Sequence, residues 1–212
     1  MEKKSKNDYL VIGSLLFLGT VPGIAGIYRL SQLFAGKNIN IDNKRFFNDP
    51  IPAIVHIIAV IVFSIVGAFQ FSEGIRHKQL MWHRISGRML VPVGIISALS
   101  GLWLTVTYPK VPTDGEWLYS IRLVVGLWMI LCMLLGFIFI LKKKITSHSH
   151  WMIRGYAIGM GAGTQVFTHL PYFILVGGDP SGLGRDLMMG AGWFINFIIA
   201  EWIICMDKKR KI

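Results

Sequence analysis

Acidic side chains are scarce in this chain of 212 residues, which has 11 Asp and Glu residues against 22 Lys and Arg. Charged residues of either sign make up only 16% of the chain, whereas 53% of its residues are hydrophobic. The mean hydropathy is +0.55. Soluble domains carry about 25% charged residues, so this composition excludes an ordinary soluble domain and favours a membrane protein.

Cysteine is also scarce, because the chain has only Cys132 and Cys205 and no C-x-x-C pair. This excludes a disulfide framework and a cysteine-rich zinc site. The pair His148 and His150 lacks partners at the spacing of zinc ligands, and we expect no acidic residue beside the histidines of the outer membrane layer. A metal-dependent hydrolase is therefore not predicted.

Long apolar runs dominate what remains, and each is near or above the roughly 20 residues that span a bilayer. The connections between them are too short for a soluble domain. The sequence predicts an all-α integral membrane bundle of six transmembrane helices, forming one domain over residues 1–212. The six runs are Tyr9–Ala35, Ile51–Phe71, Met89–Tyr108, Trp117–Leu141, Met152–Val176 and Leu187–Met206.

The basic residues are distributed unevenly, with 15 of the 22 on one side of this six-pass topology. The positive-inside rule makes that side cytoplasmic, so both termini are predicted to lie inside the cell membrane. Topology and attraction to anionic lipid explain the net charge of +11 without a nucleic-acid partner. The first run continues past a weak signal-peptide cleavage pattern at Gly23–Ala25, so we expect a retained helix.

Four basic or imidazole groups fall at one depth near the predicted outer face. They are Arg29, His56, Arg122 and His169, each on a different helix. Each lies roughly 5–8 residues from its outer helix end, or about 7–12 Å deep. Ionisable residues inside a membrane usually face the bundle interior and serve a function there, so this outer layer is the strongest candidate site.

A second set of polar residues lies at the predicted cytoplasmic face. His83, Arg84 and Arg88 open the third run as H-R-x-x-G-R, and His150 and Arg154 precede or open the fifth as H-W-M-x-R. Gln70 ends the second run. Snorkelling of the arginines to lipid headgroups is the competing interpretation of this inner layer.

Glycines share helix faces with several of these groups. His83, Gly87, Gly94 and Gly101 lie on one stripe, and Gly155, Gly159 and Gly163 form a small-xxx-small ladder. Such stripes ordinarily allow two helices to approach closely. They also leave room for a flat ring beside the backbone.

The leading hypothesis is a b-type haem protein that transfers electrons across the membrane. A low-spin haem needs two facing imidazoles, space for the ring and cations for its propionates. His56 and His169 are the first predicted axial pair, with Arg29 and Arg122 at the propionates. His83 and His150 are the second, with His148 or His77 as alternatives, and the remaining inner-layer candidates are Arg84, Arg88, Arg154 and Gln70.

The hypothesis allows one or two haem b groups. His150 and His169 are about 28 Å apart along an ideal helix, and this separation is large for fast electron transfer between two stacked haems. If the protein is an enzyme, it is a haem-dependent transmembrane oxidoreductase. Its electron donor and acceptor would be separate molecules, since the chain has no flavin or nicotinamide module. The sequence leaves its oligomeric state open.

Two alternatives use the same residues without haem. In the first, the outer layer binds or transports an anionic ligand or lipid through Arg29 and Arg122, with the histidines as hydrogen-bonding groups. Against transport, the sequence shows no inverted repeat and no interrupted helix pair. In the second, the chain is a structural factor and His56 and His169 bond only to their neighbours.

Several of these motifs together resemble an uncharacterised family of bacterial multi-pass membrane proteins, the domain of unknown function 2306. The resemblance covers roughly residues 50–205, through His56, the H-R-x-x-G-R and H-W-M-x-R motifs, Asn196 and Glu201. It implies a membrane protein but no activity. More loosely, the chain resembles two-haem b-type transmembrane cytochromes such as ferric reductases, although its fourth run has Arg122 where these have histidine.

Overall fold

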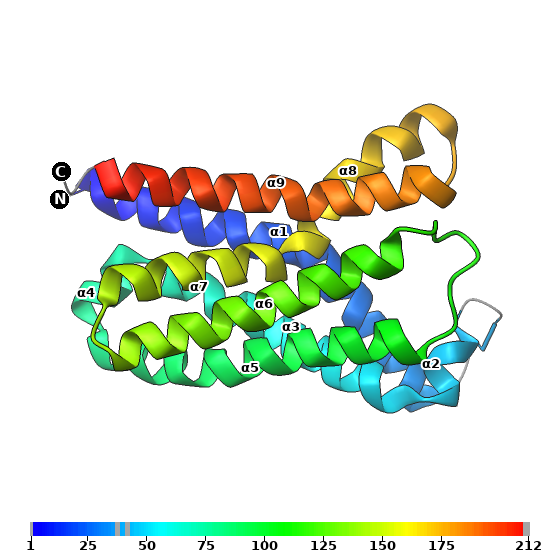
Figure 1. Ribbon diagram of the computed structural model, residues 1–212, viewed down its shortest axis with the longest axis horizontal. Coiled ribbons are helices and arrows are strands. Elements are labelled where there is room, and N and C mark those ends of the chain that lie inside the picture. The colour runs from blue at the N-terminus through cyan, green and yellow to red at the C-terminus, as the bar shows by residue number, and fades with distance from the viewer. Residues whose placement is uncertain (1, 37–38, 41–42, 210–212) are drawn as a thin grey trace.

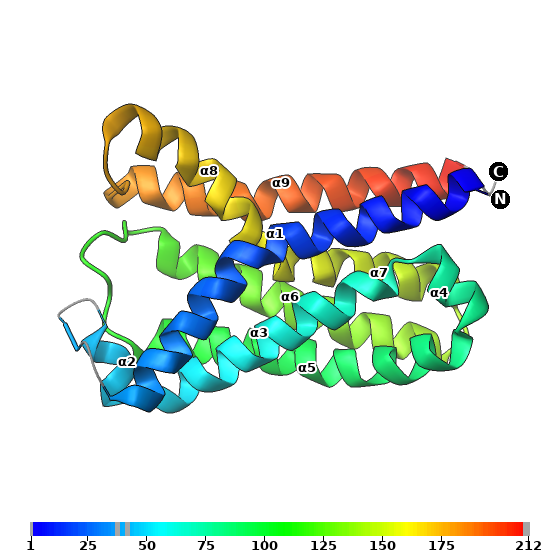
Figure 2. The ribbon, with the colours of Figure 1, turned by 180° about the vertical axis from the view of Figure 1, so that it is seen from behind.

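The computed structural model describes residues 2–36, 39–40 and 43–209, with side chains from residue 8 onward, and these residues are almost entirely helical. Both termini lie at one end of the bundle (Figures 1 and 2). We name this the terminal end, and the end that carries α2 and the 108–117 and 177–181 connections the loop end. The helices are α1 (Glu2–Ala35), α2 (Lys44–Asn48), α3 (Pro50–Gln70), α4 (Glu73–Lys78), α5 (Leu80–Thr107), α6 (Leu118–Leu141), α7 (Ile145–Gly159), α8 (Gly161–Val176) and α9 (Gly182–Lys209).

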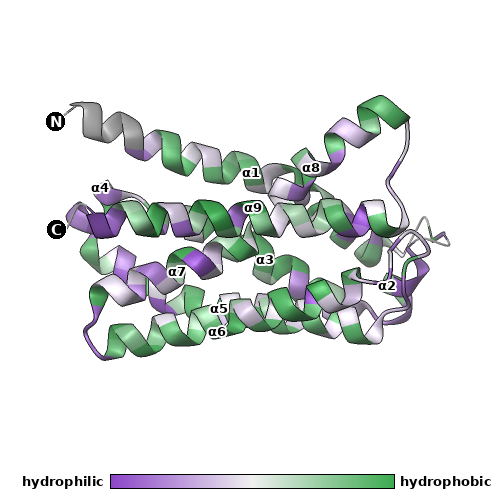
Figure 3. Ribbon diagram, turned by 45° about the horizontal axis from the view of Figure 1, so that its top comes forward, coloured by the Kyte–Doolittle hydropathy of each residue, from purple (hydrophilic) through white to green (hydrophobic). Residues whose placement is uncertain are grey.

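Five helices in the described part of the chain are long and apolar enough to cross a membrane. They are α1, α3, α5, α6 and α9. Hydrophobic residues dominate the middle of the bundle, and hydrophilic residues gather at its two ends (Figure 3). Chains with this distribution sit in a bilayer with their polar ends at the two interfaces.

The helices extend beyond several of the apolar runs that predicted them. α5 begins at Leu80 instead of Met89, and α9 covers Gly182–Lys209 instead of Leu187–Met206. Backbone hydrogen bonding continues into polar helix ends that a hydropathy argument leaves out. The short helices α2 and α4 were not predicted from the sequence, because neither is long enough to show an apolar period.

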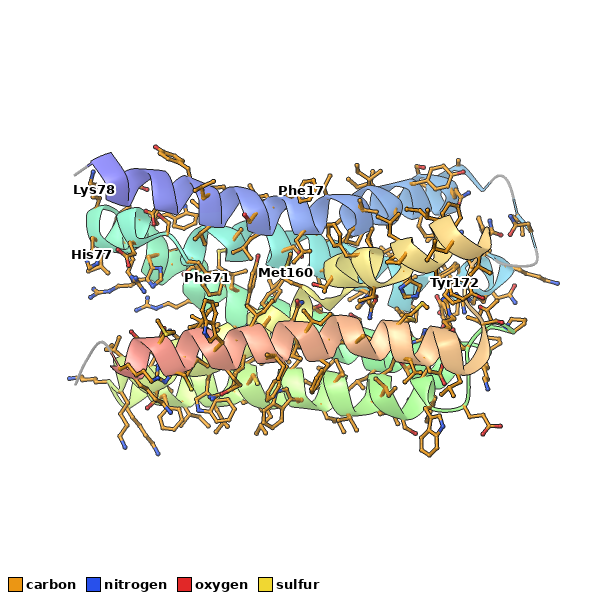
Figure 4. The ribbon with its side chains drawn as sticks, turned by 90° about the horizontal axis from the view of Figure 1, so that it is seen from above. Phe17, Phe71, His77, Lys78, Met160 and Tyr172 are labelled. Atoms are coloured by element: carbon orange, nitrogen blue, oxygen red, sulfur yellow. The ribbon has the colours of Figure 1, made fainter. Side chains whose placement is uncertain are left out.

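The fifth predicted span, Met152–Val176, is not one continuous helix, so its prediction as a single helix was wrong. α7 ends at Gly159 and α8 begins at Gly161, with Met160 between them (Figure 4). The backbone of Met160, at φ −83° and ψ 2°, leaves the helical region. Together α7 and α8 run from the terminal end to the loop end (Figure 1).

A polar side chain from α9 bridges this break. Asn196 donates a hydrogen bond from Nδ2 to the carbonyl of Ala157 at 2.9 Å, and its Oδ1 accepts one from Thr164 Oγ1 at 2.7 Å. A carbonyl at the end of a helix inside a membrane needs such a partner. Asn196 therefore supplies from outside the hydrogen bonding that the interrupted helix lacks.

The core is built on close helix approach at glycines, as the glycine stripes predicted. A Cβ added at Gly94 would lie 2.7 Å from Phe63 Cε2, and one at Gly159 would lie 2.7 Å from Phe63 Cε1. Phe63 is 2% exposed and packs with Met133 and Tyr156 in the central cluster. The glycines of α5 and α7 thus seat one aromatic ring of α3 between the two helices.

Candidate functional site

A cavity of about 630 Å³ lies at the loop end of the bundle. It is bounded by α3, α5, α6 and α9, by the 108–117 connection, and by the helix break between α7 and α8, which contributes Ile158, Gly159 and Ala162. The volume lies within the range typical of small-molecule sites. The polar side chains in its lining include Arg45, His56, Lys110, Asp114, Glu116, Arg122 and Gln165.

His56 lines this cavity with its ring fixed against α5. Its Nδ1 lies 3.0 Å from the carbonyl of Ser97 and 3.1 Å from Ser100 Oγ. A carbonyl only accepts, so the proton is on Nδ1 and Nε2 keeps its lone pair. Gly101 permits this position, because a Cβ there would lie 3.1 Å from the ring. The result is an oriented imidazole with one nitrogen available to a ligand.

Arg122 also lines the cavity, but it already has an acidic partner. Its Nη1 lies 2.7 Å from Asp114 Oδ2, and Arg185 Nε lies 2.8 Å from the other oxygen of the same carboxylate. Burial raises the pKa of Asp114, but its hydrogen bonds and charge interactions with Arg185 and Arg122 outweigh burial and lower the pKa overall. An acidic residue thus pairs with an arginine of the predicted outer layer, whereas the hydrogen-bond partners of His56 and His169 are backbone carbonyls and hydroxyls.

Arg45 is one of the cavity residues that the sequence analysis missed. Its guanidinium carbon lies 4.8 Å from the centre of the Phe46 ring, and Arg29 stacks on the same ring at 4.5 Å. Arg45 Nε is buried and has no hydrogen-bond partner among the residues described. Its only sequence signal was a basic residue beside an aromatic pair, outside every apolar run.

The four predicted outer-layer residues are only partly brought together. His56 and Arg122 line the cavity, whereas Arg29 donates to Gln32 at 2.8 Å and reaches the cavity wall only through Phe46. His169 is absent from the lining in the described part of the chain. Its Nδ1 donates to the carbonyl of Gln165, one turn earlier on α8, at 2.7 Å.

At the terminal end, two of the predicted inner-layer residues contact acidic side chains of α9, and Arg154 forms an ion pair. Arg154 donates to both oxygens of Glu201, at 2.5 and 2.8 Å, and lies 4.8 Å over the ring of Trp151. His150 Nε2 lies 3.1 Å from Asp207. These contacts tie α7 to α9 and leave His150 without a free Nε2.

The other inner-layer residues have different surroundings. Gln70 donates to Ser86 Oγ at 2.7 Å, and Arg84 and Arg88 are exposed. His83 Nδ1 is buried and lacks a hydrogen-bond partner in the part of the chain described, and its electrostatic neighbours are Arg76, His148 and Arg84. The imidazole near His83 is therefore that of His148, whose own Nδ1 donates to the carbonyl of Gly136 at 2.8 Å.

A second cavity, of about 480 Å³, lies at the terminal end between α1 and α4. There Asp8 accepts hydrogen bonds from Ser72 Oγ and from the backbone nitrogens of Glu73 and Gly74, so its carboxylate caps α4. His77 and Lys78 lie on the same short helix (Figure 4). Within the described residues, no group of three or more His, Cys, Asp or Glu side chains gathers into a metal-ion site.

Comparison with known proteins gives a family but no activity. Neither a curated protein nor a solved structure matches the chain. The model of one family, described as a predicted membrane protein family, matches residues 53–204. This segment includes α3 through most of α9, and with it His56, Arg122 and Asn196. The chain belongs to the predicted membrane protein family DUF2306.

Proposed function

We propose that this protein binds an amphipathic anionic ligand in the loop-end cavity, as a step in its recognition or transport at the membrane. The single observation behind this proposal is that one cavity gathers Arg45, Arg122 and His56 against largely apolar walls. Cationic groups suit an acidic head, apolar walls suit a hydrocarbon body, and His56 Nε2 accepts a hydrogen bond.

The helix break beside the cavity supports this function over a purely structural one. Non-helical backbone at membrane depth occurs where it is buried in protein or lines a cavity. Transporters place such breaks at their substrate sites. Here Gly159 and Ala162, on either side of Met160, both line the cavity.

The proposed topology has six crossings of the cell membrane, with α7 and α8 together forming the fifth. The basic terminal end then faces the cytoplasm, and the cavity lies in the outer half of the bilayer. A cysteine introduced at Gly178, in the 177–181 connection, should react with a membrane-impermeant maleimide in intact cells. One introduced at Lys143, between α6 and α7, should react only after lysis, and the reverse pattern would invert this topology.

A binding experiment tests the proposed function directly. Trp193 lines the cavity, so a bound bromododecanoate should quench its fluorescence in protein held in a nonionic detergent. A Trp193→Phe variant should lose that component of the quenching. Equal quenching in the two proteins would place the probe outside the cavity and contradict the proposal.

A second candidate function, transmembrane electron transfer by b-type haem, has its own supporting observation. His56, His148 and His169 each donate from Nδ1 to a backbone carbonyl, which leaves Nε2 available as in metal-bound histidines. The loop-end cavity offers one such imidazole with Arg45 and Arg122 for propionates, and Met129 and Met189 also line it. A bound haem would supply one-electron chemistry.

The spectrum of the purified protein separates the two functions. Protein expressed with a haem precursor should show a Soret band and sharp α and β bands after reduction if haem is bound. A His56→Ala variant should then lose the outer haem, and His83→Ala or His148→Ala an inner one. Colourless protein that still binds bromododecanoate would leave only the anionic-ligand function.

A further inference from the structure

We propose that Arg45, on the short helix α2, is the residue that receives the acidic group of the ligand, and that this ligand carries a single negative charge. The inference deepens the proposed function and depends on it. It assigns the site to a helix outside every predicted span and outside the residues that match the family model.

Arg122 is not the free cation of the cavity. Asp114 accepts from Arg122 at 2.7 Å through one carboxylate oxygen and from Arg185 at 2.8 Å through the other. Asp114 is only 7% exposed, so separating this group would leave a buried carboxylate with fewer partners. A ligand acid at Arg122 would have to compete with an intramolecular partner that is already in place.

Arg45 lies in the same cavity and forms no ion pair with the acidic residues that the structure describes. Its Nε is buried and makes no hydrogen bond to any described residue, an arrangement that costs free energy unless a ligand or water completes it. The ring of Phe46, 4.8 Å away, holds the guanidinium in place. Burial lowers the pKa of Arg45. The charge of Asp114 raises this pKa, whereas the charges of Arg122 and Arg29 lower it further. A second negative charge nearby would therefore stabilise the protonated form.

The charges of the lining match a monoanion. Three cationic side chains, Arg45, Lys110 and Arg122, and two acidic ones, Asp114 and Glu116, line the cavity. One positive charge is therefore left over with His56 neutral. A carboxylate or phosphodiester with an apolar body restores neutrality, whereas a neutral amphiphile does not.

The test compares two probes that differ only in charge. Bromododecanoate and bromododecanol are titrated into the full-length protein in nonionic detergent, and quenching of Trp193 gives a Kd for each. Wild-type protein should bind the acid about tenfold or more tightly than the alcohol, the worth of a charge-assisted hydrogen bond. Arg45→Gln should remove this preference, and Arg45→Lys should retain part of it.

Matched variants make the result specific to Arg45. Lys142→Gln removes a positive charge at the terminal end and should keep the wild-type preference. Size-exclusion profiles identify misfolded variants. If Arg45→Gln is misfolded, the conservative Arg45→Lys variant decides whether the preference for the acid depends on Arg45.

Two outcomes overturn the inference and are distinguishable. If wild-type protein prefers the acid and Arg45→Gln keeps that preference, the assignment to Arg45 is wrong but the proposed function stands. If neither probe quenches Trp193 in wild-type protein, the proposed function fails and the inference fails with it.

The source of the monoanion is found by competition in nanodiscs. Phosphatidylglycerol added to phosphatidylcholine nanodiscs should displace bromododecanoate if the native ligand is a lipid headgroup. If only free dodecanoate displaces it, the ligand is a free fatty acid. In either case the competition should depend on Arg45, and displacement unaltered by Arg45→Gln would again contradict the assignment.

Discussion

The charged side chains at the two ends of the bundle have different kinds of partner. At the terminal end, Arg154 is held by Glu201 and His150 by Asp207. At the loop end, one carboxylate, Asp114, serves both Arg122 and Arg185, and Arg45 Nε has no hydrogen-bond partner within the described chain. The terminal-end contacts join α7 to α9, whereas the loop-end arginines Arg45 and Arg122 line the cavity of about 630 Å³.

The loop end has a second buried acidic residue, Asp186, whose carboxylate binds the backbone and not the arginines named above. Asp186 is fully buried at 0% exposure and accepts from the backbone nitrogens of Gly115 and Trp117 at 2.8 and 2.9 Å. Both carboxylate oxygens of Asp186 therefore accept hydrogen bonds from the backbone of the 108–117 connection. It therefore fixes the cavity wall and leaves the arginines to other partners.

The largest expected effect comes from removing this carboxylate. Asp186→Ala leaves two buried backbone donors without partners and should destabilise the protein by about 3 kcal/mol. The thermal unfolding midpoint in detergent should fall, and binding of bromododecanoate should weaken as the cavity wall loosens. An unchanged midpoint would mean that the loop end does not depend on Asp186.

The next largest effect is expected at the helix break, which lies between the two ends. Asn196→Ala removes the partners of Ala157 and Thr164 and should cost about 1–2 kcal/mol, as for other hydrogen bonds between membrane helices. Asn196→Asp retains an acceptor for Thr164 but places a buried carboxylate opposite the Ala157 carbonyl, so it should not recover the loss. Equal stability of Asn196→Ala and wild-type protein would show that the break needs no bridge.

Acid should weaken the ion pairs of Asp114 at the loop end. The pKa of Asp114 is lowered in the folded protein relative to the roughly 3.9 of an unfolded chain. Its ion pairs therefore contribute stability above about pH 4, and this contribution is lost as the pH falls through the lower, folded pKa. Comparing wild type with Asp114→Asn between pH 6 and 3 should show a difference in midpoint that shrinks toward the acid end.

The smallest effect is expected at the terminal end. Glu201 is 32% exposed and Arg154 is 18% exposed, so their ion pair is partly screened. Glu201→Gln retains a hydrogen-bond acceptor and should cost under about 1 kcal/mol. Preference for bromododecanoate over bromododecanol should not change, and a large change there would remove the distinction between the two ends.

Hydropathy predicted the helical membrane bundle well, because long apolar runs have few other solutions in a bilayer. It did not predict the break at Met160, since Gly159 and Gly161 continue the apolar run and Gly159 also belongs to the small-xxx-small ladder. The residue that bridges the break, Asn196, lies far along the chain. A contact of that kind has no signature in local sequence.

Depth along a helix predicted two of the four outer-layer residues in the cavity, His56 and Arg122. Depth could not identify the cavity side chains that lie outside the predicted spans. Arg45 lies on a short helix and Asp114 in a connection, where depth arguments do not apply. His169 has the expected depth, but its Nδ1 bonds within α8, because depth does not determine which neighbour a ring faces.

The interrupted helix also affects how the chain enters the bilayer during synthesis. α7 has 15 residues and α8 has 16, so neither alone reaches the roughly 20 that a translocon recognises as a spanning segment. The carbonyl of Ala157 acquires its partner only when Asn196 arrives with α9. In the proposed six-crossing topology, the crossing formed by α7 and α8 therefore gains this hydrogen bond from a helix that leaves the ribosome after it.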